Sequence, residues 1–379
     1  SKIFTDVREV EITRAIANEF HDVLIDRAES DVIIIGAGAS GLMMASLLND
    51  KNLKVCVLDS NATIGAKIKV SGGAKCNITN KYLHESNFLG EQDFIKSIFS
   101  KFDNNDLLKF LHKNSLYPNL NEKIVKGTYF CNSSNEVISL FKKLTKDIHF
   151  KLNTTVKNVE YLENLFCIKT DKNIIKTKKL VVASGGKSFA NLGASDIGFK
   201  IAENFGHRVQ TLNPALVGFT VQKDQFWFKE LSGLSLNVKI KVDGKTVVGD
   251  MLFTHKGCSG PAILTTSLYW KKGKFSIDFL PSKDSYLPKR FKKAIKELDI
   301  DIRNYEISPA GNYGYTKAEV TKGGISTSEI NVESMESKLQ KDLYFLGEVL
   351  DVTGELGGYN FQWAFSSAVK CSMLLSLTE

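Results

Sequence analysis

The sequence lacks the cysteine spacing of a zinc site or a disulfide framework. Its 379 residues include six cysteines, and no two of them form a CxxC pair. Zinc sites and disulfide-stapled domains need such close spacing, so the sequence argues against both, and no metal site is expected. Scattered reduced thiols are typical of cytoplasmic proteins, and the cytoplasm is the localisation that we expect.

Long apolar runs and proline are also scarce. No stretch of about 18 apolar residues occurs, and the first residues mix acids with bases where a signal peptide has an apolar region, so membrane spanning and secretion are disfavoured. Proline occurs 6 times against 28 glycines, the apolar fraction is 43% and the charged fraction is 24%, a composition typical of folded globular proteins. The length allows two or three domains, or one large domain with an insertion.

The excess of basic residues is modest. Lys and Arg number 50 against 42 Asp and Glu, a net charge of +8. This charge is compatible with a nucleic-acid partner but lies below the concentrated basicity of dedicated nucleic-acid modules. The segment PKRFKKAIKEL at residues 288–298 gathers several of the basic residues in a helical pattern. It is either a docking helix for RNA phosphates or a solvated surface helix.

A glycine-rich turn follows the first apolar strand. GAGASG (residues 36–41) has the GxGxxG spacing and opens a helical pattern, and Asp59 closes the next strand 23 residues after Gly36. In such a unit Gly36 makes the tight turn, Gly38 lets the backbone approach a pyrophosphate, and Gly41 packs helix against strand, while the acid holds a ribose hydroxyl. The pattern predicts a dinucleotide-binding βαβ unit; the alternative is a glycine-rich turn without a ligand.

Motifs near the C-terminus favour FAD over NAD. LYFLGEVLD (residues 343–351) places Gly347 and Glu348 at the end of an apolar strand, where flavoproteins of the two-dinucleotide type hold the ribityl chain with an acid. The helix after GGYNFQ (residues 357–362) points its first amides toward a flavin ring, where they stabilise negative charge on the reduced form. The alternative is that these glycines form an ordinary loop.

The middle of the chain has a different pattern. Residues 180–186 read as another buried strand, whereas residues 209–248 alternate and are rich in Val, Thr, Phe and Ile, which predicts an antiparallel insert. Two segments, residues 65–80 and 249–264, are dense in Gly, Ser, Asn and Lys. We expect the backbone of both segments to line a site.

These segments together resemble the bacterial BaiN/RdsA family of NAD(P)/FAD-dependent oxidoreductases. The resemblance covers residues 31–379, with the motifs in the order of the family. It implies an α/β fold, in which a Rossmann-like FAD-binding domain of the glutathione-reductase type is interrupted by a β-barrel-like insert. Further segments that carry the resemblance are ASGGKSFANLGASDIGFKIAENFGH, NPALVGF, AEVTKGGIS and MESKLQKDLYFLGEVLDVTGELGGYNFQWAFSSA.

The resemblance implies a domain division. Residues 31–208 and 320–379 form the discontinuous FAD-binding domain, and residues 209–319 form the insert with its short basic helical segment. Residues 1–30 carry a helical apolar stripe and are expected to form a lead-in helix. This lead-in resembles that of archaeal-type thiazole synthases, and the likeness ends at Gly41. It is a natural extension or an engineered junction.

Matching the family residue by residue gives a set of expected FAD contacts. Val156 falls where such proteins pair their backbone with the adenine. The full set is Gly36, Gly38, Ser40, Gly41, Asp59, Lys67, Gly72, Gly73, Asn77, Val156, Gly185, Gly347, Glu348, Asn360 and Phe361.

Two side chains are candidates for catalysis. Cys76 lies in a segment expected beside the flavin, where a thiol is able to donate a proton to a carbon that receives hydride; the alternative is a buried inert thiol. His255 lies in a polar, Gly-rich motif and is a candidate general acid or substrate hydrogen-bond donor; the alternative is a turn histidine. Lys67 and Lys75 are expected to hold phosphate or flavin.

Four functions follow from these motifs. The first is FAD-dependent hydride transfer to an electron-poor double bond, with NAD(P)H as electron donor. No second GxGxxG follows a strand, so the nicotinamide visits the flavin directly or another reductant serves. The second, implied by the resemblance, is reduction of uridine to dihydrouridine in large-subunit ribosomal RNA, which requires the base to leave its stack. The others are a non-catalytic flavin-binding assembly factor and thiazole synthesis, against which the FAD-type C-terminal motif speaks.

Overall fold

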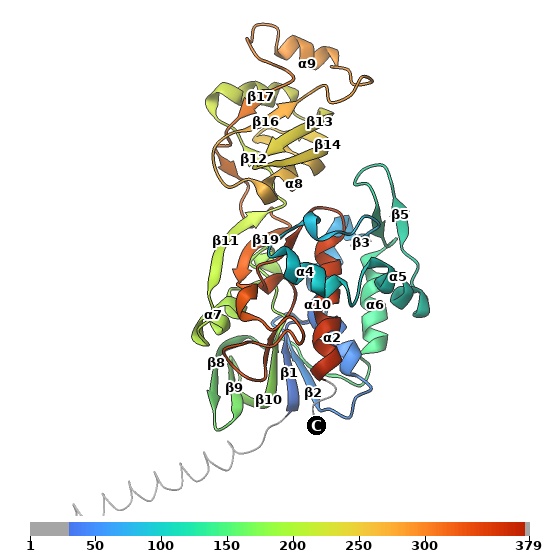
Figure 1. Ribbon diagram of the computed structural model, residues 1–379, viewed down its shortest axis with the longest axis vertical. Helices are drawn as coiled ribbons and strands as arrows, with labels where there is room; N and C mark the ends of the chain where they lie inside the picture. Colours follow the sequence, from blue (N-terminus) through green and yellow to red (C-terminus); the bar gives the residue numbers. More distant parts are fainter. Residues whose placement is uncertain (1–29, 376–379) are drawn as a thin grey trace, which may run out of the picture.

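The computed structural model describes residues 30–375, which form two units joined by a narrow connection (Figure 1). The larger unit is built from both ends of the described chain, and the smaller unit from its middle. The lead-in helix expected for residues 1–30 lies, except for Ser30, outside the described residues.

A seven-stranded sheet forms the centre of the larger unit. Its first strand, SDVIII, is buried on both faces, as a central parallel strand rich in Ile and Val should be. β10 serves two partners on one edge: its first half pairs antiparallel with β9 and its second half pairs parallel with β20. Along the sheet the order is β7 (His149–Lys151), β2 (Val55–Leu58), β1 (Ser30–Ile35), β10 (Ile174–Val182), β9 (Leu165–Thr170) and β8 (Val156–Leu162), with β20 (Leu343–Phe345) beside β10.

Helices cover this sheet, and the longest, α10 (Tyr359–Leu375), packs against α2 (Ala39–Leu48). α10 is buried along most of its length. The sequence predicts this helix from residue 362, but it begins at Tyr359 because Gly357 and Gly358, both at positive φ, end the preceding loop. The other helices of this unit are α3 (Ala66–Val70), α4 (Gln92–Phe99), α5 (Asn104–Lys113), α6 (Ser134–Leu144) and α7 (Ile197–Asn204).

Two small sheets lie beside α10. Two amphipathic helices, α4 and α5, lie next to the small sheets (Figure 1). The three-stranded sheet has the order β3 (Asn77–Asn80), β6 (Thr128–Phe130) and β5 (Asn119–Asn121), and the two-stranded sheet pairs β21 (Thr353–Gly354) with β4 (Phe88–Leu89).

The smaller unit holds a second sheet, whose pairings are all antiparallel. β17 and β18 stand at opposite ends of the strand order, yet only residues 308–310 separate them in the chain. Their ends therefore lie at most about 14 Å apart, and the sheet must curl back toward itself. The order is β17 (Tyr305–Ile307), β16 (Phe275–Asp278), β13 (Ser235–Val242), β14 (Lys245–Phe253), β15 (Gly257–Ser259), β12 (Phe219–Thr220) and β18 (Gly311–Asn312).

Aromatic side chains fill the core of this second unit. Trp227 contacts Phe228, Phe253 and Phe291 with ring centroids 4.7 to 6.3 Å apart. The helices here are α8 (Pro261–Tyr269) and α9 (Lys289–Ala294), and α9 lies at the end far from the larger unit (Figure 1). α9 is the short basic helix expected from the sequence.

A two-stranded ribbon joins the units. The chain enters the smaller unit through β11 (Val209–Ala215) and leaves it through β19 (Val320–Ile325), and these strands pair antiparallel. Each unit has its own cluster of buried apolar side chains, and the smaller cluster runs from Ala215 to Val320. We keep residues 209–319 as the proposed extent of the insert.

Candidate functional site

A cavity of about 340 Å³ opens at the carboxyl ends of the parallel strands. The loops that follow β1, β2 and β10 contribute Gly38, Asp59 and Gly185 to its wall. In open parallel sheets, ligands bind at this edge, because the loops there vary without disturbing the sheet. The volume lies within the range of small-molecule and cofactor sites.

The glycines of the turn after β1 have different surroundings. A Cβ on Gly36, whose φ is +109°, would lie 2.3 Å from the Ala183 carbonyl oxygen, and a Cβ on Gly41 would lie 1.8 Å from the Gly36 oxygen. Both positions require glycine, because a Cβ there would clash with the nearby backbone. Gly38 has nothing within 4 Å of such a Cβ, because it faces the cavity. It is also the N-cap of α2 and has no side-chain cap, so the first amides of α2 are free to bind an anion.

Asp59 is held firmly at the end of β2. Its Oδ2 accepts a hydrogen bond from the Ala37 amide at 2.7 Å, and its Oδ1 accepts from the amide and the side chain of Asn61 at 2.8 and 2.9 Å. A carboxylate has about four acceptor positions, so Oδ2 keeps one for a ligand hydroxyl. This geometry fits the predicted contact with a ribose.

An ion pair crosses the cavity wall. The Lys67 Nζ lies 2.6 Å from the Glu348 Oε2, and the Thr321 amide donates to the Glu348 Oε1 at 2.8 Å. The two charged residues are 281 positions apart in the chain, on α3 and in the loop after β20. Lys67 also lies 5.7 Å from the centroid of the Phe189 ring. The acid is therefore fixed by both a backbone amide and a cation.

The backbone after α3 is strained. Gly72 and Gly73 have φ of 56° and 65°, and the non-glycine residues Ala74 and Cys76 also have positive φ, at 68° and 57°. Such conformations cost about 1 to 3 kcal/mol each in a residue with a Cβ and are concentrated at binding and catalytic sites. Gly72 and Gly73 line the cavity, as the sequence predicts.

The loop before α10 closes the other part of the wall. Gly357, Gly358, Asn360 and Phe361 all line the cavity. The Asn360 side chain accepts from the Gly354 amide at 2.8 Å and donates to its carbonyl at 2.9 Å, so its amide group holds the loop in place. Asn360 therefore uses its side-chain oxygen and nitrogen within the protein.

Sequence reasoning missed Glu355, which also lines the cavity. Its carboxylate accepts from the Tyr269 hydroxyl at 2.5 Å and from the Asn87 side chain at 3.2 Å. Burial raises the pKa of Glu355 above the ordinary value, and these hydrogen bonds oppose that rise. Tyr269 belongs to α8 of the smaller unit, so the contact joins the two units. Its position in the GELGGYN motif is the signal that could have indicated Glu355.

Most of the expected contacts meet at the cavity, but Gly41 and Gly347 lie behind its wall. A Cβ on Gly347 would lie 2.7 Å from the Ser40 hydroxyl, so this glycine permits close packing. The expected contacts that line the cavity are Gly36, Gly38, Ser40, Asp59, Lys67, Gly72, Gly73, Asn77, Val156, Gly185, Glu348, Asn360 and Phe361.

The two catalytic candidates are not part of this lining. Cys76 is 0% exposed, and burial raises its pKa to about 12. His255 is exposed on the turn between β14 and β15, and Lys75 is exposed with its ammonium 5.6 Å from the centre of the Phe130 ring. Their roles in binding or catalysis stay predictions.

Residues 249–264, which are expected to line a site, contribute nothing to the lining of this cavity. They form the end of β14, β15 and the start of α8. Gly257 permits close strand packing, because a Cβ there would lie 2.3 Å from the Phe219 carbonyl oxygen. A role of this segment at a site stays a prediction.

Comparison with known families assigns the chain to one of them. The model of the HI0933-like protein Rossmann domain matches residues 30–374. The chain belongs to this HI0933-like family. Membership confirms the resemblance found in the sequence and the fold class, and it makes the protein one of the flavoprotein oxidoreductases, the enzyme class that the motifs predict.

Three curated relatives match along nearly the whole chain. Two are named ribosomal RNA dihydrouridine synthase: one from Escherichia coli is 35% identical over 90% of this chain and 97% of its own length, and one from Haemophilus influenzae is 36% identical over 92% and 98%. The third, a 3-dehydro-bile acid delta(4,6)-reductase from Clostridium scindens, is 27% identical over 88% and 96%.

Two further likenesses are more limited. A thiamine thiazole synthase from Archaeoglobus fulgidus is 45% identical over 69 residues, 18% of this chain and 26% of its own length. A match of this length must include residues beyond Gly41, so the expectation that the likeness ends at Gly41 is wrong. The solved structure of the E. coli quinol fumarate reductase subunit FrdA has a TM-score of 0.52 and 13% identity, covering 92% of this chain and 70% of that one. This likeness concerns the fold.

The residues present fit FAD as the cofactor. The open position at Gly38 lets a pyrophosphate approach the first amides of α2, Asp59 has an acceptor position for a ribose, and Glu348 is fixed where a ribityl chain is expected. Across residues 30–375 there is no group of three or more His, Cys, Asp or Glu side chains arranged to hold a metal ion. Nor does any helix in that range have the length and apolarity needed to cross a membrane.

Proposed function

We propose that this protein uses bound FAD and NAD(P)H to reduce uridine to dihydrouridine in ribosomal RNA. One observation carries the proposal: two relatives named for this activity are 35% and 36% identical over at least nine-tenths of this chain and nearly all of their own length. The family resemblance implies the ribosomal RNA of the large subunit, and we propose to test this RNA first.

The substrate is one member of the class predicted from the sequence. The C5=C6 bond of uridine is conjugated with a carbonyl group, so it is an electron-poor double bond that takes hydride at C6 and a proton at C5. FAD supplies hydride chemistry when bound. The protein's part is to hold the cofactor, exclude water, position the base and provide the proton.

Glu355 is our candidate for the proton source. Unlike Cys76 and His255, it lines the cavity, and its raised pKa keeps a proton available to higher pH than for an ordinary carboxyl group. The Tyr269 hydroxyl and the Asn87 amide hold it in one orientation. We expect Glu355→Gln to bind FAD as the wild type does and to lose most reduction of RNA.

The proposal is tested by an anaerobic absorbance titration. The purified protein with FAD is reduced with NADH or NADPH, and ribosomal RNA lacking its modifications is then added. Bleaching by one nucleotide, reoxidation by RNA and dihydrouridine in the digested RNA are the expected results. A flavin that neither nucleotide bleaches would contradict NAD(P)H as donor, and bleaching without dihydrouridine would contradict the RNA substrate.

A small conjugated ketone is the second candidate substrate. The relative named 3-dehydro-bile acid delta(4,6)-reductase, at 27% identity, favours it. Reduction of an enone is the same addition of hydride and proton to a conjugated double bond. Reoxidation of the bleached flavin by a steroid enone, but not by RNA, would favour this candidate.

A further inference from the structure

An exposed surface lies beside the cavity and contributes none of its lining residues. It is formed where the loop between β5 and β6 meets the end of β3, and we call it the hairpin surface. The sheet order β3-β6-β5 places this loop next to the residues that follow β3. Figure 1 shows β5 at the side of the larger unit. The hairpin surface consists of Lys81, Tyr82, Lys123, Ile124 and Lys126.

Large apolar and aromatic side chains on this surface face solvent. Tyr82 is 46% exposed and Ile124 is 66% exposed. Single exposed apolar residues are common, but two of them together beside a cavity indicate a binding surface.

Lysines lie on this surface around the Tyr82 ring. The ammonium groups of Lys81 and Lys126 lie 5.6 and 5.3 Å from the centre of the Tyr82 ring. From residue 107 to residue 135 the only acid is Glu122, which lies 3.4 Å from Lys81 in an exposed ion pair. Such a pair contributes little stability, because water screens it. The surface is therefore basic and aromatic together.

This surface is attached to the cavity wall. The Asn80 side chain donates to the Lys126 carbonyl at 3.2 Å and to the Gly357 carbonyl at 3.0 Å. A Cβ on Gly357 would lie 2.7 Å from the Val125 side chain, so the loop packs directly on a residue that lines the cavity. A ligand bound to the hairpin surface thus lies next to the cavity, at the end formed by Gly357 and Gly358.

We propose that the hairpin surface binds the single-stranded RNA that flanks the target uridine. The inference rests on the proposed function, since it names where that RNA docks. Exposed rings stack on bases without regard to sequence, and lysines neutralise the neighbouring phosphates. A base that has left its stack then has a short path into the cavity. Tyr82, between two lysines, is the stacking platform.

The basic helix α9 provides the contrast. It has a higher density of Lys and Arg, but it lies at the end of the smaller unit far from the cavity (Figure 1). Its own aromatic residue, Phe291, is buried in the core, while Tyr286, just before the helix, is 78% exposed. Lys292 and Lys293 of α9 therefore serve as a control for basic residues that lie far from the cavity.

Binding of a labelled, unstructured oligouridine RNA to the FAD-loaded full chain tests the inference by fluorescence anisotropy over a range of salt. We expect Tyr82→Ala to weaken binding about five-fold or more and Tyr82→Phe to bind as the wild type does. Lys123→Gln with Lys126→Gln should lower the slope of log affinity against log salt by about 0.7 for each phosphate that is no longer neutralised. Lys292→Gln with Lys293→Gln should leave both the affinity and the slope unchanged. FAD content and far-UV circular dichroism show that each variant is folded.

The outcomes separate this inference from the proposed function. Unchanged binding by the hairpin variants, or an equal loss in the α9 control, overturns the hairpin surface. Dihydrouridine formed in ribosomal RNA at wild-type rate by Tyr82→Ala overturns it as well, while leaving the proposed function intact. RNA binding that depends on Tyr82 in a protein that never forms dihydrouridine supports the surface and contradicts the proposed function.

Discussion

Glycine does two different jobs in the turn between β1 and α2. At Gly41 it permits contact within the protein, because a Cβ there would lie 1.8 Å from the Gly36 oxygen. At Gly38 it keeps the cavity open, because a Cβ there would meet nothing within 4 Å. The φ of Gly38 is −87°, which any residue adopts. Glycine is therefore needed at this position for the space that it leaves for a ligand.

This difference predicts opposite behaviour of two alanine variants. Gly41→Ala should lower the free energy of unfolding by about 3 kcal/mol or more, because the new Cβ forces β1 and α2 apart. Gly38→Ala should unfold at the temperature of the wild type but bind FAD about ten-fold more weakly, a loss of about 1.4 kcal/mol. Thermal unfolding of the apoprotein and flavin fluorescence quenching measure the two quantities. Equal effects of both variants on unfolding would contradict the assignment.

The Lys67–Glu348 pair leads to a second prediction. Glu348 has a side-chain exposure of 16%, so Lys67→Met leaves a largely buried carboxylate with the Thr321 amide as its remaining partner among these contacts. We expect the free energy of unfolding to fall by about 1 kcal/mol, and the double variant Lys67→Met with Glu348→Gln to recover most of it. Urea unfolding of the four proteins completes the cycle, and purely additive effects would show that the pair is not coupled.

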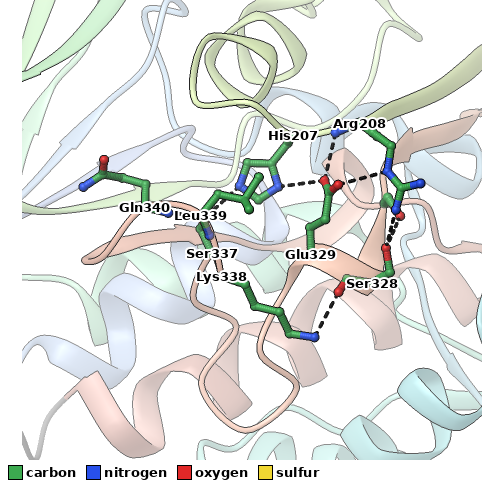
Figure 2. A network of polar contacts seen from close by, with 9 residues as sticks. His207, Arg208, Ser328, Glu329, Ser337, Lys338, Leu339 and Gln340 are labelled. Carbon is green, nitrogen blue, oxygen red and sulfur yellow. Dashed lines mark hydrogen bonds and ion pairs between the residues drawn. The ribbon is translucent and has the colours of Figure 1, made fainter.

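At the scale of elements, the ribbon of β11 and β19 is fixed at its base by a polar network (Figure 2). Glu329, just after β19, accepts from the Arg208 amide at 2.8 Å and from the Arg208 side chain at 2.9 Å. Buried His207, just before β11, lies 3.4 Å from Glu329 and 2.6 Å from the Ser337 hydroxyl. The two chain segments that carry the insert therefore start from one rigid point.

This network predicts a pH dependence. Burial lowers the pKa of His207 below its usual value, and Glu329 opposes that shift. Because the folded pKa is the lower one, the contribution of His207 to stability is present above about pH 6.5 and is lost as the pH falls through the folded pKa. The free energy of unfolding should therefore decline between about pH 6.5 and 5, and His207→Gln should flatten that decline.

Urea unfolding at several pH values measures this slope. Burial acts to raise the pKa of Glu329, but its contacts with Arg208 outweigh burial and lower that pKa. The stability that Glu329 contributes is therefore lost only below about pH 4.5, outside the range of pH 5 to 6.5. Parallel curves for the wild type and His207→Gln over the range would rule out this role of His207.

At the scale of the whole molecule, two separate apolar cores hold all six cysteines. Each cysteine is a buried thiol outside any disulfide, five of them in the core of the larger unit or at its edge and Cys258 in the core of the smaller unit. Burial raises the pKa of Cys76, Cys131 and Cys258 to about 12. These three thiols are therefore neutral at physiological pH and shielded from reagents.

We expect the native protein to react slowly with a thiol reagent such as Ellman's reagent at pH 8. The unfolded protein should release six equivalents per chain at once, because none of the six cysteines is in a disulfide. The absorbance at a fixed time, before and after addition of guanidinium, gives the number of reacting thiols in the native and in the unfolded protein. One fast equivalent in the native state, traced to Cys76 by mass spectrometry, would show that this thiol is accessible and would favour its predicted catalytic role.

Part of this molecule could be predicted because the determining residues are close in the chain. The apolar run of β1, the turn glycines and the first part of α2 lie within 19 positions, and local sterics decide their conformation. The helix after Gly357 and Gly358 was predictable for the same reason. The role of residues 249–264 was not, because a glycine permits a close contact without indicating whether a ligand or a strand makes it.

The sequence by itself determined the nucleotide-binding turn, the acid at the end of β2, the family and the interruption of one domain by an insert. Tertiary structure alone decided which polar groups share the cavity. At the cavity, it pairs Lys67 with Glu348 and brings Tyr269 of α8 to Glu355. Outside the cavity, it places His255 on an exposed turn and Tyr82 between two lysines. Local conformation follows from neighbouring residues, whereas these contacts join positions that only the packing of elements brings together.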